Sequence, residues 1–540
     1  MSGSEAGDRR RIAITAAVVV TALAAAWLSG AELHRLGDRD GWASFTDLLG
    51  SLTSPDLSSG FLARIGTLAI ESVLIGALGL ALALVLATGL AVLAARIPGL
   101  PDDPLTRPWR LWIQRIIRAT ARGILVFYRS VPEILWAYLF VRILGLGAGP
   151  AVLAIGITFS GIIGKLFAEL IEAADPEPIR LLRASGAGSV AVFLYGVLPQ
   201  VRGQWIAYAL FRLECAIRSA SILGVVGAGG LGSEIDLSIR YFQYDKLATA
   251  LLAVLAYVVV LELVSVALRR ARPLWPVSLF VLGALAGLIW LDIPWGDIIS
   301  SDAVDQFTEF AGGFLHPNTE ASFVWHALEL AAITVAMAWC ATVVAAGIAF
   351  VLAPMSATTF TLRGYLQNAP RGRGPTRWAA VLLIVPSRLS LQLARSLPEL
   401  IWALLFIVWV GPGVTAGILA LTVHTTGILG RLFGDALEEA QPEPPRMIEA
   451  TGAGPLARYL YGVLPQAFPR MLSFALFRFE VNIRDAAMVG FVGAGGLGYA
   501  MHTAISLFHM SDLATLVGMT IAAVLLFDWL GDRVRLELLR

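Results

Sequence analysis

The residues best suited to bind a charged molecule are charges set inside two apolar stretches of the chain. Each stretch carries two arginines and a glutamate at the same spacing, namely Arg212, Glu214, Arg218 and Arg478, Glu480, Arg484. A charge near mid-bilayer costs at least about 2.5–3.5 kcal/mol on insertion scales, so such groups need partners or water. Guanidinium stays charged when desolvated and its fork matches phosphate oxygens, which makes an anion a candidate ligand.

The same spacing also allows a purely structural interpretation. Glu214 lies four residues before Arg218, and Glu480 lies four before Arg484. This puts each pair on one helical face with the acid first, which is the favourable order. Each glutamate would then neutralise its arginine and hold the bundle together. The two interpretations can coexist, and the sequence leaves both open.

Two further arginines begin a proline-containing helix start, Arg-Ser-x-Pro-Glu, at Arg129 and at Arg395. Proline fits a first helical turn, and the free backbone N–H groups there favour anions. Alternatively, each arginine extends its charge to the cytosolic interface. Both interpretations stay open.

A glycine-rich turn follows each charged stretch. The candidate gate or hinge residues are Gly227, Gly229, Gly230, Gly493, Gly495 and Gly496. These are not dinucleotide fingerprints, because no strand precedes them, and they lack the Lys-Ser/Thr ending of ATPase phosphate loops. Glycine permits tight turns and close helix approach, so plain packing is the alternative to a gate.

Composition places these residues in a membrane protein. Of 540 residues, 57% are hydrophobic and 15% charged, against about a quarter charged in soluble domains, and the mean hydropathy is +0.75. Lysine and arginine number 40 against 39 aspartates and glutamates, so charge gives no indication of nucleic-acid binding. Two cysteines in apolar runs and six scattered histidines predict no disulfide framework and no metal site.

Helices of about 20 apolar residues cross a bilayer. The predicted spans are 12–29, 61–95, 123–146, 150–171, 203–226, 247–268, 275–292, 325–353, 378–410, 414–436, 468–492 and 512–530. Arginine-rich segments recur after every second span, so the positive-inside rule puts them and both termini in the cytoplasm. The first span could be a cleaved signal peptide ending in small residues, but cleavage would leave an odd number, so we expect a retained anchor.

The second half of the sequence repeats the first. A shift of 266 overlays the halves without a gap from about residue 129 to 232, and Leu194–Gln200 returns letter for letter at 460–466. Six spans per half give both halves the same orientation, as a parallel repeat. We therefore expect an all-α integral membrane protein of about 12 helices, with repeats at 1–270 and 271–540 and a pathway between them.

Each repeat has a long cytoplasmic segment between its fourth and fifth spans, at about 174–200 and 440–466. Proline marks its start, an amphipathic turn follows, and glycine marks a break. This predicts a short helix, a turn and a second helix outside the membrane, giving two docking elements on the cytosolic face.

These segments resemble the coupling loops of binding-protein-dependent ABC importer permeases of the type I fold. Gly186 and Gly452 match the loop glycine, and Leu-Pro follows at 198–199 and 464–465. The usual Glu-Ala-Ala is absent, since Arg-Leu-Leu and Arg-Met-Ile occupy those positions. The resemblance implies that ATPase coupling involves Ala184, Gly186, Ala187, Ala450, Gly452 and Ala453.

Among such permeases, the chain is most similar to those for phosphonate. The similarity rests on Arg-Ser-x-Pro-Glu, Leu-Tyr-Gly-Val-Leu-Pro-Gln, Phe-Arg-x-Glu and Val-Gly-Ala-Gly-Gly-Leu-Gly. It implies an inner-membrane subunit that imports phosphonate, phosphate or phosphite, with Arg129, Arg212, Glu214, Arg218, Arg395, Arg478, Glu480 and Arg484 along the pathway. It also implies two copies of a separate ATPase, which bind ATP and Mg, and an extracytoplasmic binding protein. This chain would bind no cofactor and hydrolyse no ATP.

Other functions remain as alternatives. A permease for methionine or another amino acid shares the Arg-Ser-x-Pro and glycine-rich strings. An ion-coupled secondary transporter would not need paired cytoplasmic loops. A membrane enzyme acting on lipid phosphates is disfavoured, because no His/Asp/Glu/Cys constellation is present.

The repeats also differ within the charged stretches. Ala216 aligns with Asn482, and Ser219 aligns with Asp485. Asp485 would temper the positive charge of Arg484, so our hypothesis is that Arg218 is the stronger anion contact.

Overall fold

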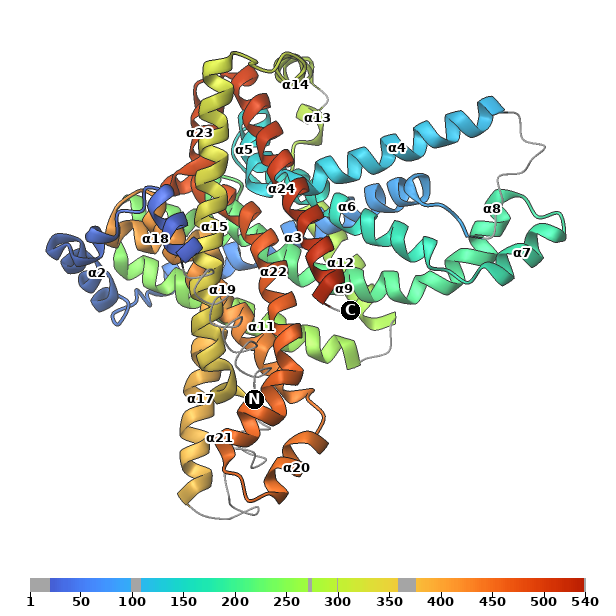
Figure 1. Ribbon diagram of the computed structural model, residues 1–540. Helices are drawn as coiled ribbons and strands as arrows, with labels where there is room; N and C mark the ends of the chain where they lie inside the picture. The colour runs from blue at the N-terminus through green and yellow to red at the C-terminus, as the bar shows by residue number, and fades with distance from the viewer. Residues whose placement is uncertain (1–19, 99–107, 271–273, 299, 358–374, 539–540) are drawn as a thin grey trace. The chain divides into compact units, whose positions relative to one another are not determined.

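A computed structural model describes residues 20–98, 108–270, 274–298, 300–357 and 375–538 (Figure 1). All regular secondary structure in these ranges is helical. The chain divides into two compact units. We call residues Leu49–Gly312 the first lobe, and Met1–Leu48 with Gly313–Arg540 the second lobe.

The first lobe contains α3 (Ser59–Ala94), α4 (Pro108–Ser130), α5 (Glu133–Leu144), α6 (Ala148–Glu172), α7 (Pro176–Ala184), α8 (Ser189–Ala191), η2 (Val192–Val197), α9 (Leu198–Leu223), η3 (Gly224–Val226), α10 (Leu231–Arg240), α11 (Tyr244–Arg270), α12 (Leu274–Trp290), α13 (Trp295–Ile298) and most of α14 (Ser301–Leu315). The second lobe contains helical residues 20–28, η1 (Leu33–Gly37), most of α2 (Arg39–Ser51), α15 (Ala321–Ser356), α17 (Pro375–Ser396), α18 (Glu399–Val410), α19 (Val414–Glu438), α20 (Glu443–Ala450), α21 (Pro455–Ala457), η4 (Arg458–Val463), α22 (Leu464–Val489), η5 (Gly490–Ala494), α23 (Gly496–Ser506) and α24 (Met510–Leu538).

One long helix organises each lobe. The helices α3 and α15 have 36 residues each, well beyond the roughly 20 that cross a bilayer core. The α3 helix packs on α6 and α9, and α15 packs on α19 and α22. Both carry a fully buried alanine stripe at four-residue spacing, at Ala83, Ala87, Ala91 and at Ala345, Ala349, Ala353. Small side chains let neighbouring helices approach closely, as membrane bundles require.

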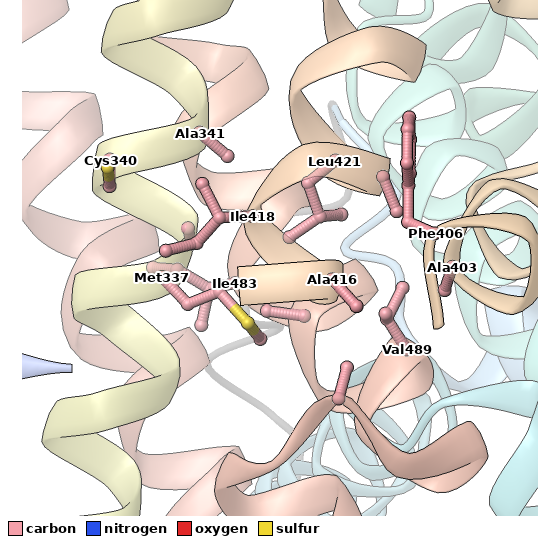
Figure 2. Packing of buried hydrophobic residues seen from close by; sticks show 14 of the residues in the cluster. Met337, Cys340, Ala341, Ala403, Phe406, Ala416, Ile418, Leu421, Ile483 and Val489 are labelled. Atoms are coloured by element: carbon pink, nitrogen blue, oxygen red, sulfur yellow. The ribbon is translucent and has the colours of Figure 1, made fainter. Parts of the chain in front are cut away.

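The core of the second lobe shows how these helices interlock (Figure 2). Met337 and Ala341 of α15 point toward Ile418 of α19 and Ile483 of α22, while Phe406 of α18 covers the far side. The cluster consists of apolar side chains in close contact, which stabilises the lobe.

The helices match the predicted membrane class. Among the described residues, six helices are long and apolar enough to span, namely α3, α6, α11, α15, α19 and α24. Two bent pairs, α4–α5 and α17–α18, raise the number to eight. The remaining predicted spans lie on α9, α22, the shorter α12, and residues 12–29, which are described only from residue 20. The total of twelve spans stays a prediction.

The spans expected at 123–146 and 378–410 are not straight helices. The α4–α5 pair bends by 89° and the α17–α18 pair by 95°. Pro132 and Pro398 are the N-cap residues after each bend. The residue before a proline is driven away from helical geometry, so the chain turns there and starts a new helix.

The two lobes exchange their first helices. Residues 20–28 belong to the first repeat, yet Ala26 packs into the core of the second lobe with Met337. Conversely, α12 belongs to the second repeat but packs on α3 of the first lobe, where a Cβ on Gly287 would lie 3.0 Å from the Leu74 carbonyl oxygen. The compact units therefore differ from the sequence halves 1–270 and 271–540 by one swapped segment each.

Candidate functional site

The first charged helix, α9, contains one of the predicted ion pairs. Arg218 donates from Nη2 to Glu214 Oε1 at 3.2 Å, and both side chains are largely buried. The four-residue pairing is thereby confirmed in this copy. The positive charge of Arg218 is balanced within its own helix.

Arg212 is held differently. Its Nε and Nη2 donate to the Tyr208 hydroxyl at 2.9 and 2.7 Å, and its guanidinium carbon lies 5.1 Å from the centre of the Tyr208 ring. Phe211 lies beside it, at 5.7 Å. Among the residues that the structure describes, no carboxylate forms an ion pair with Arg212. It therefore carries an orientated positive charge that aromatic rings support.

The equivalent arginine of the second lobe, Arg478, is neutralised. It donates from Nη2 to Asp485 Oδ2 at 2.8 Å, and the two residues are 9% and 8% exposed. Seven residues are nearly two helical turns, so both side chains lie on one face of α22. Asp485 thus balances Arg478, whereas the sequence had suggested that it tempers the neighbouring Arg484.

A polar network surrounds this pair. The fully buried Asn482 donates to the Thr342 hydroxyl at 2.8 Å and accepts from the Thr425 hydroxyl at 3.0 Å. Thr425 in turn lies 3.5 Å from Arg478 Nε. The network joins α15, α19 and α22, and each member satisfies a neighbour that would otherwise be buried without a partner.

A buried histidine–glutamate pair lies on α18 and α19. His424 Nδ1 is 3.0 Å from the Leu397 carbonyl oxygen, and Nε2 is 3.4 Å from Glu399 Oε2. A carbonyl only accepts, so Nδ1 carries a proton in this geometry. In the first lobe, the equivalent Glu133 instead accepts from the Ser219 hydroxyl at 2.7 Å.

The first lobe cannot form this network, because its sequence has apolar residues at two of the equivalent positions. The positions that repeat Thr425 and Asn482 are Phe159 and Ala216, both buried and apolar. Sequence reasoning noted the Ala216/Asn482 and Ser219/Asp485 differences but missed Glu133, Glu399 and His424. The repeated glutamate after Pro132 and Pro398 was the available signal.

Glu480 and Arg484 lie four residues apart on α22. Glu480 is buried, and its carboxylate packs over Gly531 of α24. The Glu480–Arg484 pair stays a prediction.

Arg129 and Arg395 do not begin a helix. They lie in the last turn of α4 and α17, just before each bend, and the following proline starts the next helix. Arginine suits the negative end of a helix dipole. Arg395 folds back on its own helix, where Nε donates to Gln392 Oε1 at 2.9 Å.

All six predicted turn glycines adopt a backbone that L side chains rarely allow. Their φ angles lie between +66° and +103°. The turns are also tightly packed, because a Cβ on Gly498 would lie 1.9 Å from the Ala487 carbonyl oxygen. Ser72 and Thr334 accept from the first backbone N–H groups beyond each turn, at 3.0 and 2.9 Å. These contacts support the packing interpretation, and a gate stays a prediction.

The two segments predicted to be cytoplasmic, 174–200 and 440–466, have the predicted helix–turn–helix form. Gly186 and Gly452 have φ of +85° and +78° and end α7 and α20. Gln200 bonds the backbone N–H and carbonyl of Asp175, and Gln466 does the same for Gln441. The candidate coupling residues Ala184, Gly186, Ala450 and Gly452 are exposed, while Ala187 and Ala453 are half-buried.

These features together define a two-lobed, multi-pass membrane transport subunit. Residues 107–273 and 385–535 each match the family described as "Binding-protein-dependent transport system inner membrane component". The chain therefore belongs to this family of ABC importer permeases and carries its domain twice.

Its relatives come from bacteria. The "Phosphate-import permease protein PhnE" of Mycolicibacterium smegmatis is 30% identical over 515 residues, which cover 92% of this chain and 90% of the relative. The "Phosphite transport system permease protein PtxC" of Stutzerimonas stutzeri is 36% identical over 270 residues, covering 50% of this chain and 92% of the relative. A chain of the MetNI methionine ABC transporter matches with a TM-score of 0.35 and 23% identity, over 41% of this chain and 100% of that one; this likeness is too weak to argue from.

The polar network predicts an unequal cost for two matched substitutions. Asp485→Ala would leave Arg478 buried without its carboxylate, which costs about 3–5 kcal/mol. Ser219→Ala, at the repeated position, removes one hydrogen bond and should cost about 1–2 kcal/mol. Thermal unfolding of both variants in detergent measures the difference, and equal midpoints would refute the assigned role of Asp485.

The glycine turns predict a similarly sharp contrast. Gly498→Ala should prevent normal folding, because the added Cβ meets a backbone carbonyl that cannot move away. Gly518→Ala in α24, where a Cβ meets nothing within 4 Å, should be neutral or stabilise by about 0.5–1 kcal/mol. Yield of monodisperse protein on size exclusion is the measurement; normal yield of the first variant would contradict the packing.

Proposed function

We propose that this chain forms the translocation pathway for a phosphorus oxyanion of the phosphonate, phosphate or phosphite type. The names of the relatives, PhnE for phosphate and PtxC for phosphite, support this cargo. One observation in the chain itself carries the proposal: Arg212 holds an orientated guanidinium against Tyr208 with no described ion pair. Such a group can bind phosphate oxygens with its remaining donors.

The lobes differ in how much positive charge they offer. Arg478 is paired with Asp485 and Arg218 with Glu214. Arg212 is therefore the strongest anion contact in our proposal, which moves the emphasis from Arg218 to Arg212 within the first lobe. A fused chain permits such inequality, whereas a homodimer of identical halves would not.

The family implies partner proteins, and we propose their number and places. Two copies of an ATPase would dock on residues 174–200 and 440–466 and hold the ATP and Mg. A binding protein would deliver cargo from outside the inner membrane, with both termini of this chain in the cytoplasm. The chain itself would then catalyse no hydrolysis.

A repeated apolar surface supports the docking sites. The exposed apolar side chains on the two segments fall at matching positions, namely Leu181, Val190, Leu194, Tyr195 and Met447, Leu456, Leu460, Tyr461. Tyr195 and Tyr461 are each 74% exposed. Contiguous exposed apolar groups on a soluble face mark a protein interface. The same residue types at the same repeat positions suit two copies of one partner.

Membership of a binding-protein-dependent family argues against an ion-coupled secondary transporter. Methionine or another amino acid remains the competing cargo.

Uptake of labelled phosphate tests the cargo. Proteoliposomes would contain this chain, its ATPase and its binding protein, with unlabelled phosphonate, phosphite and methionine as competitors. We expect block by phosphorus oxyanions and a reduction of roughly tenfold or more in Arg212→Gln, since charge-assisted hydrogen bonds are worth about 1.5–3 kcal/mol. Arg202→Gln, on the exposed start of α9, is the matched control.

Block by methionine alone would reject the oxyanion cargo. Equal losses in Arg218→Ala and Arg484→Ala would reject the hypothesis that Arg218 contributes more than Arg484.

The docking surface makes a separate prediction. Tyr195→Ser with Tyr461→Ser should abolish co-purification of the ATPase, while either single change should weaken it, because each segment binds one copy. Tyr241→Ser, at an exposed tyrosine just after α10, should have no effect. Full retention of the ATPase in the double variant would refute docking on these segments.

A further inference from the structure

A cavity in the second lobe lies among the ends of α15, α17 and α19. It encloses about 430 Å³, within the roughly 300–1,000 Å³ of small-molecule sites. Three arginines line it, Arg388 and Arg395 from α17 and Arg431 from α19. A cavity with three guanidinium groups from two helices suits an anion.

The balance of charge in the lining is positive. The acidic lining residues are Asp435 and Glu438, and Gln392 adds an amide. Each guanidinium has five N–H donors and no acceptor. Three of them against two carboxylates leave more donors than acceptors, which an oxyanion with several lone pairs can complement.

Two of the ion pairs in the lining are long. Arg388 Nη2 lies 3.4 Å from Glu438 Oε1, and Arg431 Nε lies 3.7 Å from Asp435 Oδ2. Good charge-assisted contacts measure about 2.7–2.9 Å. Both arginine side chains are about half exposed, and exposed pairs of this kind are weak.

Two of the guanidinium groups are orientated before any ligand arrives. Arg388 Nε donates to the Ser356 carbonyl oxygen at 2.8 Å, and Arg395 Nε donates to Gln392 Oε1 at 2.9 Å. These bonds use one edge of each group and fix its plane. A site whose donors are already placed loses less entropy on binding.

The first lobe lacks two of these features. The position that repeats Gln392 is Val126, and the position that repeats Arg431 is Lys165. Valine cannot orientate the arginine one turn later, and an ammonium group lacks the planar fork of guanidinium. Arg122 repeats Arg388 and its bond to a backbone carbonyl, so it is the amide at Gln392 and the third guanidinium at Arg431 that are particular to the second lobe.

We propose that this cavity binds a phosphate group as a site distinct from the charges of α9 and α22. The α19 helix ends at Glu438 and leads directly into the segment 440–466. In the proposed topology the cavity therefore opens toward the cytoplasm, where the group would come from imported product or from a lipid headgroup. The cytoplasmic placement rests on the proposed function; the ligand chemistry rests on the lining residues.

Binding to the full-length chain without its partners tests the site. One arm titrates inorganic phosphate onto the chain in phosphatidylcholine nanodiscs by equilibrium dialysis. A second arm omits free phosphate and measures stabilisation by phosphatidic acid in the nanodisc. Arg395→Gln and Arg431→Gln should each weaken either phosphate binding or the interaction with phosphatidic acid, by about tenfold or more. Lys165→Gln, at the repeated position, should leave both unchanged.

Arg431→Lys is the control for misfolding, because lysine occurs naturally at the equivalent position. This variant should fold normally and weaken binding less than Arg431→Gln does. A loss in the first arm assigns free phosphate, and a loss in the second assigns a lipid headgroup. Unchanged binding in both arms for the two glutamine variants overturns the site.

The outcome is separable from the proposed cargo. Phosphate binding here with methionine-only block of uptake would reject the cargo and keep the site. Uptake of oxyanions, together with unchanged phosphate binding in the cavity variants, would keep the cargo and reject the site.

Discussion

Charges held among apolar helices must be balanced or solvated close to where they lie, and this constraint shapes both lobes. In α9, Glu214 balances Arg218 within one turn. In α22, Asp485 balances Arg478 across two turns, and Asn482 and the threonines complete the surrounding hydrogen bonds. Arg212 is supported by an aromatic side chain instead of a carboxylate. The repeated helices therefore present different charge to their surroundings although their sequences align without a gap.

A fused chain permits this difference between the two halves. Two copies of one gene product must place identical groups on both sides of an axis, whereas a fused chain can change one side alone. The second lobe has a buried polar network where the first has Phe159 and Ala216. Its arginine cavity likewise has Gln392 where the first lobe has Val126. The glycine turns and the segments 174–200 and 440–466 differ far less between the lobes, since their backbone conformations recur in both.

Much of the architecture was predictable because hydropathy, length and repetition fix where helices lie. The bends at Pro132 and Pro398 were missed because a straight span and a broken one have the same composition. The Arg478–Asp485 pair was missed because four-residue spacing was given priority over seven-residue spacing, although both place side chains on one face. The roles of Glu399 and His424 depend on contacts between helices distant in sequence, which no local pattern contains. The exchange of first helices has the same cause.

That exchange also determines when each helix can meet its packing partner during synthesis. Residues 20–28 are made first, but their packing partner α15 begins only at Ala321. At about 5–20 residues per second, this helix waits roughly 15–60 s in the membrane before its neighbour exists. The first lobe likewise stays incomplete until α12 emerges, after the whole first repeat. The first lobe is one continuous stretch and is complete once residue 312 has emerged, whereas the second lobe needs both ends of the chain. Any chaperone of its biogenesis must therefore shield a solitary apolar helix in the interval.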